Sequence, residues 1–216
     1  MMSKTVKRTR IKICGLTRRA DLQVAIDAGA DAIGLVFYPP SPRYVDLPTA
    51  AELARAVPPF VSVVGLFVNA DPAVVHATLA AVPVHLLQFH GDEDEAYCRQ
   101  FGRPYLKAAR VKPGMRQEDL LQYAAAFPSA QGILLDAFVE GYGGGGKVFD
   151  WSLVPPELGA PLVLSGGLDA TNVEAAVRRV RPDAVDVSSG VEAAKGVKDA
   201  DKIRAFVAAV RAADAA

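Results

Sequence analysis

Short apolar runs rich in β-branched residues alternate along the chain with longer runs in which Ala, Leu and charged residues recur. The run IKIC is followed by RRADLQVAIDAG, and PLVLS is followed in the same way by DATNVEAAVRRV. A short continuous apolar run is typical of a buried strand, and apolar positions three or four residues apart are typical of a helix with one buried face. The pattern therefore predicts a series of strand–helix units.

Eight such units follow one another, with strands expected to end near Cys14, Phe37, Val68, Gln88, Arg110, Asp136, Ser165 and Ser188. Strands that alternate with crossover helices form a parallel sheet. Eight units in a chain of this length predict an α/β fold, the single-domain (β/α)8 TIM barrel. An open doubly wound sheet is the alternative. We expect residues 11–216 to form the barrel and residues 1–10 an N-terminal extension that need not be ordered.

Composition narrows the function classes. The 216 residues are 51% hydrophobic and 22% charged, with a formal net charge of zero. This balance argues against a general nucleic-acid or anionic-membrane binder. No apolar segment suits a secretory signal or a membrane span, so we expect a cytoplasmic protein. The two cysteines, Cys14 and Cys98, make no disulfide framework and lie in no Cys/His cluster, so no metal is expected.

Candidate chemistry lies where the strands are expected to end, because barrel active sites are built at the carboxyl ends of the strands. Polar residues expected at this rim include Cys14, Gln88, His90, Asp136 and Ser188. A lone buried cysteine is more often a packing residue, and an isolated carboxylate after an apolar run is often structural. Their shared position at the rim favours a functional interpretation.

Two segments, LSGGL and DVSSGVE, follow the seventh and eighth expected strands. Glycines allow backbone N–H groups to approach an anion closely, and a following helix N-terminus adds partial positive charge. For either segment alone, a tight turn is the competing interpretation. Both together, at the loops where many barrels hold a phosphate, predict a phosphate site. Its candidate donors are Gly166, Gly167, Ser188, Ser189 and Gly190.

The whole series of motifs resembles one family. KICGLTR, GLVFYPPSPRYV, VGLFVN, LLQFHGDE, LLDA, LSGGL, DVSSGVE and KGVKD resemble, in this order, phosphoribosylanthranilate isomerase. The resemblance implies a (β/α)8 barrel without metal or organic cofactor. It also implies an intramolecular oxidoreductase of tryptophan biosynthesis, which converts N-(5-phosphoribosyl)anthranilate to 1-(2-carboxyphenylamino)-1-deoxyribulose 5-phosphate by an Amadori rearrangement. The expected partner is this phosphorylated aminosugar, not nucleic acid or membrane, and we expect a monomer or homodimer.

The resemblance assigns roles to particular positions. Cys14 matches the family's general base, Asp136 its general acid, and Arg43 the position that meets the anthranilate carboxylate. We expect Gln88 and His90 to line the substrate site as binding residues.

A thiolate is the useful form of the base, so Cys14 needs a positive influence from the following helix or from a nearby cation. Lys12 shares the strand parity of Cys14, and Asp186 that of Ser188 on the neighbouring strand. We therefore predict a buried ion pair between Lys12 and Asp186 below the site. The loop with four consecutive glycines, Gly143 to Gly146, is expected to act as a mobile cover; a plain linker is the alternative.

Two other functions stay open. Another phosphate-binding barrel enzyme, such as indoleglycerol-phosphate synthase or a pentose-phosphate epimerase, would need a catalytic lysine and glutamate set or several metal ligands at strand ends. A non-catalytic sugar-phosphate-binding barrel would bind a product analogue without turnover.

Overall fold

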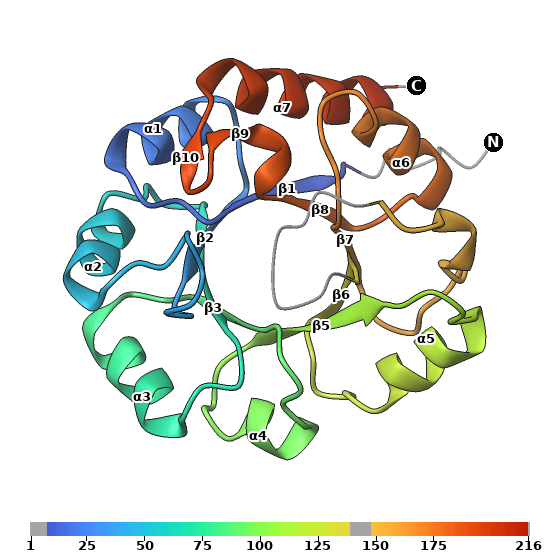
Figure 1. Cartoon of the computed structure of the whole chain (residues 1–216), viewed down its shortest axis with the longest axis horizontal. Coiled ribbons are helices and arrows are strands. Elements are labelled where there is room, and N and C mark those ends of the chain that lie inside the picture. Colours follow the sequence, from blue (N-terminus) through green and yellow to red (C-terminus); the bar gives the residue numbers. More distant parts are fainter. Residues whose placement is uncertain (1–7, 139–147, 216) are drawn as a thin grey trace.

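The computed structural model describes residues 8–138 and 148–215. Eight parallel strands close into a barrel in the order of the sequence, and helices surround it (Figure 1). The strands are β1 (Arg10–Cys14), β2 (Ala32–Val36), β3 (Ser62–Phe67), β4 (Leu86–Phe89), β5 (Tyr105–Val111), β6 (Gly132–Ala137), β7 (Leu162–Leu164) and β8 (Ala184–Val187). The closed barrel confirms the predicted fold and excludes the open sheet.

Helices follow the strands on the outside of the barrel. In the described residues they are α1 (Arg19–Asp27), α2 (Leu47–Arg55), α3 (Pro72–Ala81), α4 (Glu95–Arg99), α5 (Gln117–Ala125), α6 (Val173–Val180) and α7 (Ala200–Asp214). Several begin at an aspartate whose carboxylate accepts a hydrogen bond from the first turn, as Asp46 does from the backbone N–H of Thr49. No helix in these ranges is long and apolar enough to cross a membrane.

Two units depart from the regular pattern. After β6, the described element is a short 3-10 helix, η1 (Trp151–Leu153). After β8, a 3-10 turn, η2 (Ser189–Val191), leads into the antiparallel pair β9 (Glu192–Ala194) and β10 (Val197–Lys198) before α7 begins. The sequence pattern did not predict this small hairpin, and it lies beside the candidate site.

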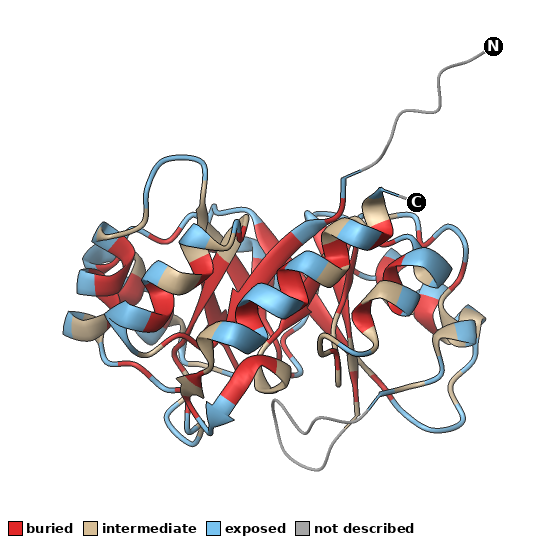
Figure 2. Ribbon diagram, turned by 90° about the horizontal axis from the view of Figure 1, so that it is seen from above, coloured by how far each residue is buried: buried red, intermediate tan, exposed pale blue. Residues whose placement is uncertain are grey.

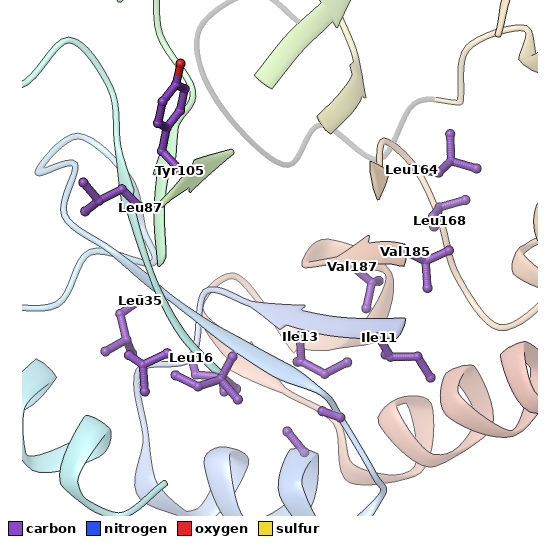
Figure 3. Packing of buried hydrophobic residues seen from close by; sticks show 14 of the residues in the cluster. Ile11, Ile13, Leu16, Leu35, Leu87, Tyr105, Leu164, Leu168, Val185 and Val187 are labelled. Atoms are coloured by element: carbon purple, nitrogen blue, oxygen red, sulfur yellow. The ribbon is translucent and has the colours of Figure 1, made fainter. Parts of the chain in front are cut away.

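Side chains of each strand alternate between two layers. Figure 2 shows the buried strands at the centre and helices that are buried on one face. Ile11 and Ile13 on β1, with Val185 and Val187 on β8, belong to the main hydrophobic core between the sheet and the helices (Figure 3). Lys12 and Cys14, which alternate with these residues on β1, point into the barrel. The two-residue period of a strand thus places core residues on its outer face and site residues on its inner face.

The barrel interior holds two small apolar clusters. Leu106, Ala108, Leu134 and Val163 form one of them. The other consists of Cys14 with Val36, Leu66 and Val68, and the partly buried Tyr38 packs against it. This second cluster gives the carboxyl end of the barrel an apolar wall next to the thiol.

The N-terminal segment is attached to the barrel where the structure describes it. The backbone N–H of Thr9 donates to both carboxylate oxygens of Asp214 on α7, at 3.1 and 3.0 Å. Arg8 pairs with Asp31 at 2.7 Å. The proposed division of the chain at residue 10 stays a prediction, because residues 1–7 lie outside the described ranges.

Candidate active site

Lys12 and Asp186 lie side by side on neighbouring strands. Their Cα atoms are paired in the register of β1 and β8, so both side chains project into the barrel. The Lys12 Nζ atom donates to Asp186 Oδ1 at 2.9 Å, and the two residues are only 4% and 5% exposed. The ion pair that strand parity predicts is therefore confirmed.

Cys14 ends β1 two residues beyond Lys12 and is 5% exposed. Burial raises the pKa of its thiol, and the neighbouring Lys12 ammonium lowers it without reversing the direction. Although burial also disfavours the charge on Lys12, Asp186 and Cys14 together raise the pKa of its ammonium, so Lys12 stays charged. A cation does act on Cys14 as expected, but burial prevails, and the resting form of Cys14 is the neutral thiol.

Gly34 lies directly opposite Cys14 on β2, because the two Cα atoms are partners in the register. A Cβ atom placed on Gly34 would lie 2.7 Å from Cys14 Sγ and 3.1 Å from Lys12 Nζ. Real Cβ atoms do not approach a sulfur so closely. Only glycine at this position leaves room for both functional side chains.

Asp136, near the end of β6, is linked to His90 and Gln88 of the β4 unit. Its carboxylate Oδ2 lies 3.1 Å from His90 Nε2. His90 Nδ1 in turn lies 3.0 Å from Gln88 Nε2, and Gln88 is completely buried. The structure thus places His90 against the predicted acid and Gln88 behind His90; their prediction as substrate-binding residues stays untested.

The loop that carries His90 is anchored from below. Lys107 on β5 is 1% exposed and donates to the backbone oxygen of Gly91 at 2.7 Å and to Glu93 Oε2 at 2.9 Å. Glu93 also accepts from the backbone N–H of Asn69 and of Gly91. This buried pair fixes the chain immediately after His90.

The two predicted phosphate loops adjoin each other and the two predicted catalytic residues. A Cβ atom on Gly166 would lie 3.0 Å from Asp136 Oδ1, so the loop after β7 passes beside the carboxylate. On the other side, the Ser188 hydroxyl donates to the backbone oxygen of Cys14 at 3.1 Å. A Cβ atom on Gly190 would overlap the backbone oxygen of Leu168, which places the two loops in contact.

These loops are shaped for backbone donors. Gly166 and Gly167 have φ angles of 85° and 64°, in the left-handed region that favours glycine. Both glycines are partly exposed, as are Ser188, Ser189 and Gly190. The five predicted phosphate residues are therefore accessible and lie on two adjoining loops at the carboxyl end of the barrel. Whether they bind phosphate is a proposal.

Arg43 lies at this end of the barrel and is already paired. Its Nε and Nη2 atoms donate to the two carboxylate oxygens of Glu192 at 2.7 and 2.8 Å, and Arg43 is 7% exposed. Lys198 Nζ donates to Glu192 Oε1 and to the backbone oxygen of Ser188, both at 2.9 Å. Two basic side chains thus share one carboxylate beside the β8 loop, which gives the cluster a formal net positive charge, although burial lowers the pKa of the Lys198 ammonium.

Sequence reasoning missed Gly34, Glu192 and Lys198. Register between the first two strands would have found Gly34, since a small residue must face a crowded interior position. The hairpin of β9 and β10 brings Glu192 and Lys198 to the site, and no apolar periodicity marks that hairpin. Cys98 is fully buried on α4 and belongs to the main hydrophobic core, so it packs and takes no part in the site. The predicted glycine cover, Gly143 to Gly146, lies outside the described residues.

The geometry places two groups suited to proton transfer beside loops whose backbone is suited to an anion. A thiol and a carboxyl project into one barrel end and are joined through two touching loops, with an apolar wall beside the thiol. In the described parts of the chain, no group of three or more His, Cys, Asp or Glu residues could hold a metal ion. The thiol of Cys14 and the carboxyl of Asp136 are themselves groups that can exchange protons.

Comparison with known proteins agrees with this geometry. The family model of N-(5'-phosphoribosyl)anthranilate (PRA) isomerase matches residues 11–209. The N-(5'-phosphoribosyl)anthranilate isomerase of Dechloromonas aromatica (strain RCB) is 68% identical over 207 residues, which cover 96% of this chain and 98% of that protein.

Solved structures give the same result. The phosphoribosyl anthranilate isomerase of Thermotoga maritima superposes with a TM-score of 0.86 at 41% identity, covering 94% of this chain and 99% of that one. A phosphoribosyl anthranilate isomerase in complex with reduced 1-(o-carboxyphenylamino)-1-deoxyribulose 5-phosphate superposes with a TM-score of 0.83 at 38% identity, with the same coverage. The chain belongs to the N-(5'-phosphoribosyl)anthranilate isomerase family.

Proposed function

We propose that Cys14 and Asp136 perform the two proton transfers of an Amadori rearrangement. The protein is an enzyme, an isomerase of tryptophan biosynthesis that converts N-(5-phosphoribosyl)anthranilate to 1-(2-carboxyphenylamino)-1-deoxyribulose 5-phosphate. One observation carries the assignment of the two residues. Asp136 adjoins the glycine loop after β7, Cys14 adjoins the serine loop after β8, and these two loops touch.

The reaction needs one acid and one base on different sides of the sugar. Protonated Asp136 gives its proton to the furanose ring oxygen, and the C1–O bond breaks to leave a Schiff base. The Cys14 thiolate then removes the proton on C2, which gives an enolamine that tautomerises to the ketone. Each positioned transfer contributes about 10²–10⁴-fold to the rate.

Lys12 supports the basic form of Cys14. Its ammonium lowers the pKa of the thiol, although burial keeps that pKa above its ordinary value. The pairing with Asp186 keeps Lys12 charged and fixed in place. A cation held by a neighbouring carboxylate favours the thiolate without making a permanent anion in the resting site.

The remaining residues orient the substrate. The glycine and serine loops after β7 and β8 would bind the phosphate through backbone N–H groups and serine hydroxyls. The anthranilate carboxylate would meet the positive cluster of Arg43 and Lys198, whose two cations are only partly neutralised by Glu192. The apolar wall of Val36, Leu66 and Val68 would then cover the aromatic ring.

The decrease in anthranilate fluorescence during turnover tests these assignments. We expect Cys14→Ser and Asp136→Asn to lower kcat by at least about 10²-fold, with KM changed only slightly, because each removes a proton-transfer group. Cys98→Ser, which alters the other buried thiol, serves as the matched control and should retain turnover. Normal kcat in either site variant would refute the role of that residue.

A cytoplasmic location and a monomeric or homodimeric state belong to the same proposal. Light scattering on a size-exclusion column distinguishes monomer from homodimer directly.

A further inference from the structure

Gln88 carries an unsatisfied polar atom in the barrel interior. Its side-chain oxygen Oε1 is buried and has no hydrogen-bond partner among the described residues, while Nε2 lies 3.0 Å from His90 Nδ1. The oxygen and nitrogen of such an amide have the same shape, so the opposite orientation fits the same space. Either orientation leaves one buried end of the amide without a partner in the described part of the protein, so the chemistry of His90 and Asp136 must decide between the two.

The two orientations impose different states on His90 and Asp136. With Nε2 toward the ring, His90 Nδ1 must accept, so Nε2 carries the hydrogen and donates to an ionised Asp136. With Oε1 toward the ring, Nδ1 carries the hydrogen and donates to Gln88. His90 Nε2 then offers a lone pair to Asp136 Oδ2, 3.1 Å away, which is satisfied only when Asp136 carries a proton.

We propose that Gln88 is a positioning residue that accepts from His90 Nδ1–H and thereby holds Asp136 in its protonated, acid-competent form. This inference rests on the proposed role of Asp136 as the general acid. His90 is the intermediary: it touches Asp136 directly, whereas Gln88 lies fully buried behind it. Gln88 selects one tautomer, and that tautomer selects one protonation state of the carboxyl.

The surroundings keep this chain of three side chains in place. The buried pair of Lys107 and Glu93 anchors the backbone of Gly91, next to His90. The imidazole itself is held between Gln88 and Asp136. The charged group nearest in register is Arg110, whose Cα atom is paired with that of Asp136 and whose Nη2 lies 3.4 Å from Asp92 Oδ1.

On the other side of β6, the glycine loop that follows β7 adjoins Asp136, since a Cβ atom on Gly166 would lie 3.0 Å from Asp136 Oδ1.

The tautomer can be observed directly. Long-range ¹H–¹⁵N NMR spectra of the uniformly labelled enzyme distinguish Nδ1–H from Nε2–H imidazole, and His90→Asn identifies the His90 signals. We expect Nδ1–H for His90 near neutral pH. An Nε2–H tautomer in the wild-type enzyme would overturn the proposal without any functional variant.

Gln88→Met tests the consequence, because methionine has a similar shape and cannot accept strongly from Nδ1–H. We expect His90 to change to the Nε2–H tautomer and kcat near pH 8 to fall by about 10-fold or more, because the ring then donates to the Asp136 carboxyl and no longer accepts from it. KM should change by less than about threefold. Gln122→Met, on the exposed face of α5, is the matched control and should change neither readout.

The outcomes separate this inference from the proposed function. If Asp136→Asn keeps full turnover, Asp136 is not the acid, whatever the tautomer of His90. If Asp136→Asn is inactive but Gln88→Met keeps both the wild-type tautomer and the wild-type pH profile of kcat, Gln88 has only a packing role and the proposal fails.

Discussion

Arg43 and Glu192 form a buried, two-point ion pair: Nε and Nη2 of the guanidinium meet Oε1 and Oε2 at 2.7 and 2.8 Å. The same carboxylate binds Lys198 and accepts weakly from the backbone N–H of Gly196. Burial opposes ionisation of Glu192, yet the hydrogen bonds from Arg43 and the charge of Lys198 lower the pKa of its carboxyl. Glu192 therefore stays charged and fixes the direction of the guanidinium.

Glu192→Gln should misplace Arg43 and leave two cations close together without their shared anion. We expect the free energy of unfolding to fall by about 3–5 kcal/mol and KM to rise by about tenfold, with a smaller effect on kcat because the acid and base remain. Urea unfolding and steady-state kinetics measure both effects. The matched control is Glu174→Gln on α6: its pair with Arg178 is 44–51% exposed, so it should cost less than about 1 kcal/mol. Equal losses in the two variants would contradict the role of Glu192.

Asp186→Asn should destabilise the barrel by removing the counter-charge of Lys12. Breaking a buried pair costs about 3–5 kcal/mol near neutral pH, because one charge stays buried without a partner. Without Asp186, burial would make the folded-state pKa of Lys12 lower than the unfolded value, so the unfolded state would bind more protons. The stability of the variant should therefore rise with pH relative to wild type.

Urea unfolding of wild type and Asp186→Asn at about pH 7 and about pH 9.5 measures this difference. Asp201→Asn removes an aspartate on α7 whose side chain is 94% exposed. This control should show neither the loss of stability nor its change with pH. If the stability difference between the two proteins is the same at both pH values, Lys12 is not a buried charge without a partner in the variant.

The strand–helix period and the alternation of side chains along each strand were enough to predict the main residues of this site. Apolar runs located the strand ends to within about one residue, which placed Cys14 and Asp136 at the rim. Because side chains alternate along a strand, parity alone also predicted the pair of Lys12 and Asp186 across 174 residues of sequence. These inferences work wherever the backbone is regular.

The contacts that could not be predicted lie where the backbone is irregular. Arg43 is in a loop and Glu192 in a three-residue strand 149 positions away, so neither parity nor period relates them. The protonation of Cys14 was also beyond the sequence, because it depends on the balance between burial and the field of Lys12. Both are properties of the packed site and not of a local pattern.

Gly34→Ala should impair catalysis through a single methyl group. The new Cβ atom would meet Cys14 Sγ at 2.7 Å and must displace the thiol or Lys12. Overpacking of this kind costs about 1–3 kcal/mol of stability, and we expect kcat to fall by at least about tenfold because a shift of about 1 Å misplaces the base. Gly65→Ala is the control: its Cβ atom would meet Phe67 and Val84 in the outer core at 3.2 and 3.3 Å. Equal kcat values for the two variants would show that Cys14 tolerates displacement.

The raised pKa of Cys14 should appear in the pH dependence of kcat/KM. Burial raises the pKa of the thiol and Lys12 lowers it only in part, so the free enzyme should gain activity with pH to above about 8.5, the ordinary value for a cysteine. In the wild-type enzyme the ultraviolet absorbance of the Cys14 thiolate should rise over the same pH range, and this rise should be missing in Cys14→Ser. Cys98, whose burial raises its pKa to about 12, titrates separately.

Linkage gives a second readout of the same group. A thiol whose folded-state pKa is raised loses its proton first in the unfolded chain, so its contribution to stability is complete below about pH 8.5 and is lost as pH rises through the folded-state value. Cys14→Ser should remove this loss of stability at high pH. Cys98→Ser should leave the part of the loss that comes from Cys14 unchanged. A kcat/KM that is already constant by about pH 7 would show that the base ionises below its ordinary range. The charge of Lys12 would then lower the pKa of Cys14 by more than burial raises it, which would contradict the raised pKa of the thiol.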